Sequence, residues 1–155
     1  MSNYQKLNQL LAEKKWKEAD IETRKLMLEI AGSLNREDCL LTEEDIKNFP
    51  CSELKKIDQL WIKYSQGRFG FSIILNIFEE VGENYGKLAE KVGWKVGDKW
   101  LAYNDLQFTN NAPIGHLPIT WLVPITFWMY WLARFASPGW GLLLNRLKTC
   151  KMNRP

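Results

Sequence analysis

Apolar residues at helical spacing, interrupted by glycine and proline, are the feature of this sequence that most constrains its fold. Six segments show the pattern, at residues 4–11, 16–30, 42–49, 54–64, 73–81 and 85–92. Apolar side chains that recur every three or four residues form one face of an amphipathic helix. No stretch alternates for long enough to build a sheet. We therefore predict an all-α fold, a single domain of five to seven helices.

Glycine and serine predict where some of these helices begin and end. Gly32 and Gly93 follow the last apolar positions of two helices, where C-terminal caps are commonly glycine. Ser72 is placed to cap the helix at 73–81. Between residues 94 and 108 the helical period is lost, and Gly97 followed by Asp98 predicts a turn or small hairpin in a short extended aromatic segment.

The C-terminal part of the chain differs in composition from the rest. After Asp105 there is no Asp or Glu. The basic residues of this part are Arg134, Arg146, Lys148, Lys151 and Arg154, and its tryptophans are Trp121, Trp128, Trp131 and Trp140. We expect a helical core at 1–118 and an aromatic and basic segment at 119–155 that packs on the same domain, in a monomeric protein.

Residues 117–133 are uncharged and apolar, which raises the question of a transmembrane helix. A membrane span needs about 20 apolar residues. This stretch is shorter, contains Pro118 and Pro124, and carries aromatic residues throughout, whereas membrane helices concentrate them at their ends. We therefore favour burial or ligand contact for it. The alternative is peripheral contact with an anionic membrane surface.

Charge and cysteine usage exclude several classes of protein. The net charge of +3 is too small to indicate nucleic-acid binding, which needs clustered Lys and Arg. Cys39, Cys51 and Cys150 show no C-x-x-C spacing and no zinc-site pattern, so a reducing compartment is the simpler inference. Residues 1–9 resemble neither a secretory signal nor a transit peptide, which predicts a cytoplasmic, organelle-encoded or already trimmed chain.

His116 is the only histidine, so any catalytic system with a histidine base depends on it. It lies in a stiff turn between Pro113 and Pro118. We favour a structural histidine whose ring bonds backbone groups over a catalytic residue or an axial metal ligand. Paired carboxylates such as Glu43 and Glu44 are typical of solvated helix faces, and no P-loop is present. We predict that the protein is not an enzyme and binds no metal.

Aromatic and cationic residues together form the strongest functional pattern. A planar macrocycle with acidic side arms needs flat apolar walls and a few guanidinium donors near its rim. Residues suited to the walls are Tyr103, Leu106, Phe108, Trp121, Phe127, Trp128 and Trp131, and those suited to donate are Arg24, Arg68 and Arg134. The alternative, which is the commoner origin of such an aromatic pattern, is that these residues only form the core.

Several ordered motifs resemble one known family. They are Leu10-Leu11 with Trp16, Glu18-Ala19-Asp20 with Thr23, Asn48-Phe49-Pro50-Cys51, Ile57-Asp58-Gln59-Leu60-Trp61, Ser65-x-Gly67-Arg68-Phe69-Gly70-Phe71-Ser72, Val92-Gly93-Trp94 and Ala112-Pro113-x-Gly115-His116-Leu117-Pro118. Together they are similar to the porphyrin-binding, magnesium-chelatase-activating family named after the genomes-uncoupled plastid signalling mutants. The resemblance covers residues 7–118.

The resemblance implies a helical fold likened to a cupped hand, which binds protoporphyrin IX or Mg-protoporphyrin IX in its palm and has no catalytic residues. It also implies a partner, the large porphyrin-binding subunit of magnesium chelatase, and a place in the cyanobacterial cytoplasm or the plastid stroma, with thylakoid association as a variant. Some relatives bind linear bilins. Carried over by position, Arg24, Ile46 and Tyr103 match pocket positions of the family, and Leu106 with Phe108 continue that segment.

Beyond Pro118 the chain departs from the family pattern. The family has Asn and Arg residues in a loop there, whereas this chain has Trp121, Pro124 and Phe127. We expect Trp121, Phe127, Trp131 and Arg134 to complete the ligand site from this segment, with Arg146 as the alternative donor. The alternative is a diverged regulatory or membrane-peripheral module that binds another tetrapyrrole or none.

Overall fold

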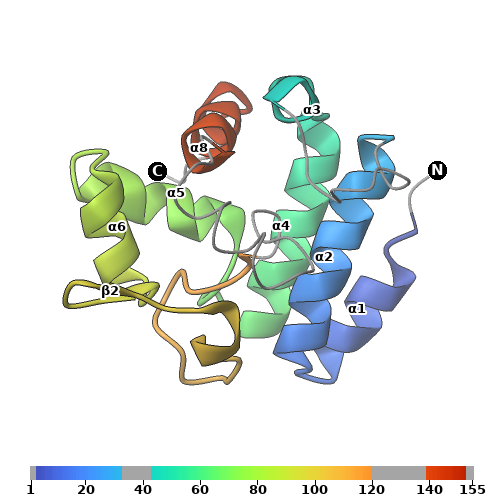
Figure 1. Ribbon diagram of the computed structural model, residues 1–155. Coiled ribbons are helices and arrows are strands. Elements are labelled where there is room, and N and C mark those ends of the chain that lie inside the picture. Colours follow the sequence, from blue (N-terminus) through green and yellow to red (C-terminus); the bar gives the residue numbers. More distant parts are fainter. Residues whose placement is uncertain (1–2, 33–42, 120–138, 153–155) are drawn as a thin grey trace.

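The computed structural model describes residues 3–32, 43–119 and 139–152 of the chain (Figure 1). Within these residues it contains seven α-helices, one 3-10 turn and one two-stranded hairpin. The helices are α1 (Gln5–Ala12), α2 (Trp16–Ile30), α3 (Glu43–Lys47), α4 (Cys51–Ser65), α5 (Phe71–Glu80), α6 (Tyr85–Lys91) and α8 (Gly139–Thr149), and the other elements are β1 (Lys95–Val96), β2 (Lys99–Trp100) and the 3-10 turn η1 (Tyr103–Asp105). The predicted all-α fold is confirmed.

The N-terminal helices form one half of the molecule, in which α1, α2 and α4 lie side by side (Figure 1). Trp16 of α2, Trp61 of α4 and Phe69 share an aromatic cluster, with ring centroids 5.3 to 6.4 Å apart. The indole Nε1 of Trp61 donates a 2.9 Å hydrogen bond to Oγ1 of Thr23. This bond satisfies a buried donor and links α4 to α2 at a fixed position.

The other half contains α5, which packs against both α6 and α8, while α8 also packs against α3 (Figure 1). The apolar spacing of α5 explains this double contact, because Ile74, Leu75 and Ile77 are all buried. From α8, Leu143, Leu144 and Leu147 enter the same core. The chain after residue 138 therefore belongs to the same packed body as the helices before residue 92.

Two predicted glycine C-caps are present, whereas the predicted serine N-cap is not. Gly32 and Gly93 have φ of 74° and 82° and follow α2 and α6, as predicted. The prediction that Ser72 caps α5 is wrong, because Gly70 is the N-cap and Ser72 lies inside the first turn. The N–H of Ser72 donates a 3.0 Å hydrogen bond to Oδ1 of Asp58 in α4. A carboxylate far away in sequence thus caps the N-terminus of α5 in place of a local side chain.

The predicted hairpin after residue 94 is present. Strand β1 pairs antiparallel with β2, Lys95 opposite Trp100 and Val96 opposite Lys99. Gly97 has φ of 62°, which a two-residue hairpin turn requires. The indole of Trp100 stacks on Tyr85, at 5.7 Å between ring centroids, and so fixes the hairpin to α6.

The C-terminal helix carries one feature that the sequence did not indicate. Cys150, directly after this helix, forms a disulfide with Cys51, with 5.4 Å between the Cα atoms and a sequence separation of 99. In the part of the chain that the structure describes, no helix is both long and apolar enough to cross a membrane. The expected burial of residues 117–133 is seen at Leu117 and Ile119, and the rest of that stretch lies outside the described residues.

Candidate functional site

One face of α2 organises the predicted ligand site. Asp20 is fully buried there, and its carboxylate accepts two hydrogen bonds of 2.8 Å, one from the Tyr103 hydroxyl and one from the N–H of Ile119. Arg24 follows Asp20 by one helical turn and lies on the same side of α2. The arrangement therefore fixes Tyr103 and the N–H of Ile119 to α2 one helical turn before Arg24.

Two further predicted residues lie in the same aromatic segment. The rings of Phe108 and Tyr103 lie 5.3 Å apart between centroids, with an interplanar angle of 59°. Leu106, which lies between these two residues in sequence, is buried. The ammonium of Lys17, one turn before Asp20 in α2, lies 5.9 Å from the Phe108 ring centroid. Its Nζ also donates to Oδ1 of Asn104 at 3.2 Å. A cation thus lies over the Phe108 ring of the aromatic pair.

Ile46 approaches from the other end of α2. It lies in α3, whereas the gold segment that carries η1 lies near the beginning of α2 (Figure 1). A 15-residue helix is roughly 20 Å long, and Arg24 lies in its middle. The structure therefore brings Tyr103, Leu106 and Phe108 toward the beginning of α2, with Arg24 in the middle of that helix and Ile46 in α3 toward its other end.

Most of the predicted residues that the structure describes are covered. The exposed fractions are 7% for Arg24, 4% for Ile46 and 6% for Leu106, while Tyr103 and Phe108 are half-buried. A ligand can therefore reach the first three only when neighbouring side chains move. The predicted residues Trp121, Phe127, Trp131 and Arg134, and the wall residue Trp128, lie outside the described residues.

Arg68, the third predicted donor, lies in a different place. Its Nη1 donates a 2.8 Å hydrogen bond to the main-chain oxygen of Ala112. Arg68 lines a hollow of about 220 Å³ between the end of α4 and the start of α2, whose walls are Lys14, Trp16, Tyr64, Ser65, Gln66, Arg68, Phe69 and Asn110. This volume is below the range of pockets for drug-sized ligands. The hollow is thus separate from the α2 face and too small for a four-ring ligand.

His116 has the structural role that we favoured. It is fully buried, its Nδ1 donates to the main-chain oxygen of Val92 at 2.6 Å, and its Nε2 accepts from the N–H of Gln107 at 2.9 Å. Burial lowers the pKa of His116 below its usual value, so the ring is neutral. With both nitrogens engaged, the ring has no free atom for proton transfer or metal binding.

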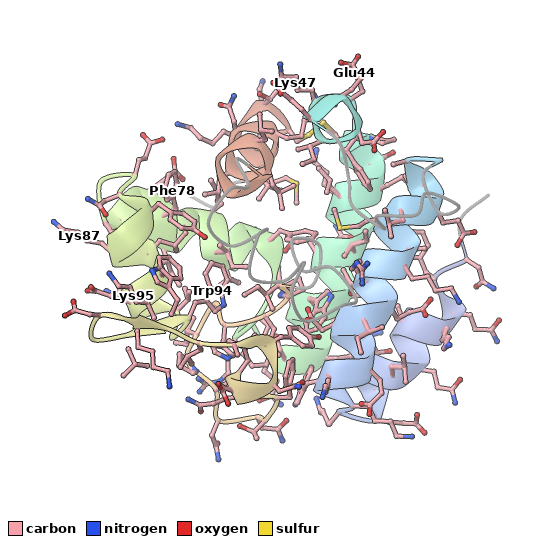
Figure 2. The ribbon with its side chains drawn as sticks, in the orientation of Figure 1. Glu44, Lys47, Phe78, Lys87, Trp94 and Lys95 are labelled. Atoms are coloured by element: carbon pink, nitrogen blue, oxygen red, sulfur yellow. A yellow bond between two sulfur atoms is a disulfide. The ribbon has the colours of Figure 1, made fainter. Side chains whose placement is uncertain are left out.

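Trp94 and the charged residues of α3 also have structural explanations. Trp94 points into the interior, whereas Lys87 and Lys95 point outward (Figure 2). Glu44 and Lys47 project from the tip of α3, as expected for a solvated helix face (Figure 2). Among the described residues, no group of three His, Cys, Asp or Glu side chains is placed to hold a metal ion.

Sequence reasoning missed three residues that shape the site. Asp20 and Ile119 form the buried junction with Tyr103, and Lys17 borders Phe108. A signal for Asp20 existed, because a carboxylate on the apolar side of an amphipathic helix must have partners when buried. The identity of those partners was not readable, since the hydrogen bonds span 83 and 99 residues.

Comparison with known proteins places this geometry in a family. Residues 1–134 match the family model described as GUN4-like. The chain is 34% identical over 118 residues to the ycf53 protein of Pyropia yezoensis, an alignment that covers 76% of this chain and 50% of that protein. It is 32% identical over 118 residues to the Ycf53-like protein of Synechocystis, with 76% of this chain and 51% of that protein covered.

A plant relative and two solved structures agree with this match. The chain is 31% identical over 120 residues to the protein of Arabidopsis thaliana named tetrapyrrole-binding protein, chloroplastic, with 71% of this chain and 45% of that protein covered. The ligand-free structure of Arabidopsis thaliana GUN4 superposes with a TM-score of 0.73 and 25% identity, over 100% of this chain and 97% of that one. GUN4 from Chlamydomonas reinhardtii gives 0.72 and 23%, over 95% and 86%, which supports the fold alone. The chain spans about half the length of the curated relatives it matches.

Proposed function

The chain belongs to the GUN4-like family, and on that premise we propose that it binds a tetrapyrrole without catalysing a reaction. The expected ligand is protoporphyrin IX or its magnesium complex, with a linear bilin as the alternative. The hydrogen bond from Tyr103 to Asp20 carries the proposal, because it holds the aromatic segment against the helix face of Arg24. The name of the Arabidopsis relative supports the same class of ligand.

The chemistry of the α2 face suits such a ligand. A porphyrin presents flat apolar faces and two propionate groups on one edge. Phe108 and Tyr103 supply aromatic surface, and Arg24 and Lys17 supply cations about two turns apart on α2. A charge-assisted hydrogen bond from a guanidinium to a carboxylate contributes about 1.5–3 kcal/mol. In the proposed complex Arg24 holds a propionate while the aromatic rings contact the macrocycle.

Binding requires the site to open, since Arg24 and Leu106 are almost fully covered in this state. A protein that opens only part of the time binds with an affinity reduced by the open fraction. The half-buried rings of Tyr103 and Phe108 offer the first contact, and the ligand then stabilises the open form. The binding rate is therefore expected to be below the diffusion limit.

We further propose that the ligand is passed to magnesium chelatase through its large porphyrin-binding subunit, as a step of chlorophyll synthesis. The occurrence of relatives in a cyanobacterium and a chloroplast supports a place in the cyanobacterial cytoplasm or the plastid stroma. A regulatory role in place of a catalytic one agrees with the closed environment of His116, whose ring nitrogens are both engaged.

The second candidate function is peripheral attachment to an anionic membrane surface. It is favoured by exposed basic residues at the end of α8, Lys148 and Lys151, in a part of the sequence without acidic residues. Flotation of the full chain with vesicles of phosphatidylglycerol and of phosphatidylcholine tests it. Selective flotation with the anionic vesicles supports this candidate, and equal recovery in both removes it.

The primary proposal is tested by titration of the full chain with deuteroporphyrin IX. Binding beside tryptophan-rich structure should shift the porphyrin Soret band and quench tryptophan fluorescence at micromolar concentrations or lower. The same titration in denaturant controls for adsorption of porphyrin to the unfolded chain. Unchanged Soret and fluorescence spectra at saturating porphyrin would refute the proposal.

A further inference from the structure

The C-terminal helix α8 is attached to the rest of the protein by one covalent and several non-covalent links. The covalent link is the disulfide between Cys51, the first residue of α4, and Cys150, directly after α8. Next to it, Nε of Arg146 donates a 2.9 Å hydrogen bond to the main-chain oxygen of Phe49. On the other side, Lys148 pairs with Glu83 at 2.7 Å. The disulfide therefore joins the C-terminal end of α8 to the beginning of α4.

The two sulfur atoms differ in their surroundings. Cys150 is only 4% exposed, whereas Cys51, the first residue of α4, is half-buried. An external thiolate can therefore approach Cys51 more easily than Cys150. Cys51 also occupies the first turn of a 15-residue helix, whose free N–H groups stabilise a thiolate. Access and thiolate stabilisation thus coincide at Cys51.

We propose that the Cys51–Cys150 bond is a reversible thiol–disulfide exchange site, whose reactant is a protein or small-molecule dithiol, and that its state controls how firmly α8 is docked. The dithiol attacks Sγ of Cys51 as a thiolate, forms a mixed disulfide and releases Cys150 as a thiolate. The second thiol of the reactant then attacks the reactant sulfur of the mixed disulfide and releases Cys51 as a thiolate. The oxidised reactant leaves with an intramolecular disulfide. Two electrons and two protons pass from the dithiol to the protein.

A reversible role agrees better with the structure than a purely structural one. Disulfides are rare in compartments where thiols are kept reduced, and those that form there are usually redox-sensing or catalytic. The relatives include a chloroplast protein and a cyanobacterial one. In addition, α8 buries Leu143, Leu144 and Leu147, so its apolar face retains its own attachment when the bond is broken. Reduction is expected to loosen α8 without unfolding the protein.

The position of α8 gives this loosening a consequence for the ligand. Helix α8 packs against α3, which carries Ile46, a predicted wall residue that is 4% exposed. A firmly docked α8 keeps α3 in its covered position. The reduced protein opens more often and should therefore bind deuteroporphyrin several-fold more tightly than the oxidised protein. This consequence, unlike the exchange site itself, rests on the proposed function.

The exchange site is tested on the full chain with Cys39→Ser, which leaves only the Cys51 and Cys150 thiols. Oxidised protein is treated with dithiothreitol without denaturant, and free thiols are counted by the mass added by a maleimide. We expect none before treatment and two after it, with unchanged far-UV circular dichroism. Thiols that appear only in denaturant, or that are already free in the oxidised sample, would overturn the proposal.

Docking of α8 is measured on the same two samples by amide hydrogen exchange. Amides of α8 should exchange about tenfold faster after reduction, while those of α2 and α4 should change little. The variant Cys51→Ser/Cys150→Ser in the same background is the control and should match the reduced protein under both conditions. Equal exchange of α8 in oxidised and reduced protein would overturn the control of docking.

Porphyrin titration of the oxidised and reduced samples is a separate readout. A lower Kd in the reduced sample supports the coupling to α3, and an equal or higher Kd refutes that coupling. If neither sample binds deuteroporphyrin, the proposed function fails, while the thiol counts and hydrogen exchange still decide the exchange site.

Discussion

The indole Nε1 of Trp94 donates a 2.8 Å hydrogen bond to the main-chain oxygen of His116, and the His116 ring in turn bonds Val92, two residues before Trp94. The two residues therefore close a loop of reciprocal contacts between the end of α6 and the turn before Pro118. Every polar atom of the His116 ring is used in this junction. Protonation of His116 would remove the acceptor at Nε2 and is therefore expected to lower the free energy of unfolding.

The first prediction concerns pH. Burial lowers the pKa of His116 below 6.5, so the unfolded chain binds a proton that the folded protein excludes. Between the folded and the unfolded pKa the free energy of unfolding should rise with pH, by at most about 1.4 kcal/mol per pH unit. The contribution is complete above pH 6.5 and is lost as the pH falls below it. Urea unfolding at several pH values measures this slope.

His116→Gln is the matching variant for the pH experiment. The chain has no other histidine, so the slope near pH 6 should flatten in this variant, while the carboxylate contribution at lower pH remains. The variant should also be less stable than the parent at pH 8, because a buried ring with two hydrogen bonds is replaced. An unchanged slope in His116→Gln would assign the pH dependence to other groups.

The second prediction concerns Tyr103. Tyr103→Phe removes the hydrogen bond to Asp20 and keeps the ring, which should cost about 1 kcal/mol of unfolding free energy. Porphyrin affinity should fall several-fold, since the aromatic segment is no longer fixed to α2. Tyr64→Phe is the matched control, because it removes a 2.8 Å hydrogen bond from a tyrosine hydroxyl to Asn8 outside the site. Equal loss of porphyrin affinity in both variants would argue against a specific role for Tyr103.

The third prediction concerns Arg24. Removal of its guanidinium in Arg24→Ala should weaken deuteroporphyrin binding by about tenfold or more, given about 1.5–3 kcal/mol for a charge-assisted bond. Arg68→Ala removes the same group from the separate hollow and should leave the affinity unchanged. The dimethyl ester of deuteroporphyrin lacks free carboxylates and should bind the parent and Arg24→Ala alike. A large difference that persists with the ester would rule out the propionate contact.

The fourth prediction concerns the turn before α5. Gly70 has φ of 142°, and a Cβ atom there would lie 2.7 Å from Oδ1 of Asp58 and 2.9 Å from Cγ1 of Ile62. Gly70→Ala should therefore destabilise the protein by about 2–3 kcal/mol through crowding and backbone strain. Gly97→Ala is the control for strain alone, since φ is 62° and nothing lies within 4 Å of its Cβ. Thermal unfolding of both variants should separate the two costs.

Much of the fold was predictable because its determinants are local. The helical spacing identified α2, α4 and α5, and a glycine in a left-handed conformation marked the hairpin turn at Gly97. The structural role of His116 was also predictable, because a lone histidine in a stiff turn between prolines has few ways to act with another group. These features depend on residues within one or two turns of each other.

The features that were not predicted all depend on residues far apart in sequence. Asp58 replaced Ser72 as the partner of the α5 N-terminus, because α4 brings a carboxylate to that end. Cys51 and Cys150 meet only because α8 packs back onto the beginning of α4. No local pattern encodes either contact. The same limit applied to the candidate site, where Arg24 and Tyr103 were predicted from the aromatic and cationic pattern and from the resemblance, whereas the role of Asp20 was not predicted.

The Asp20 carboxylate sets a condition on how the chain acquires its fold during synthesis. Its two donors, Tyr103 and Ile119, are translated 83 and 99 residues later. A nascent chain that packed α2 in its final position before then would bury the carboxylate without these donors, which is costly. This buried junction therefore forms only after Ile119 has left the ribosome. Messages truncated before the Ile119 codon should yield products that chaperones and proteases treat as unfolded.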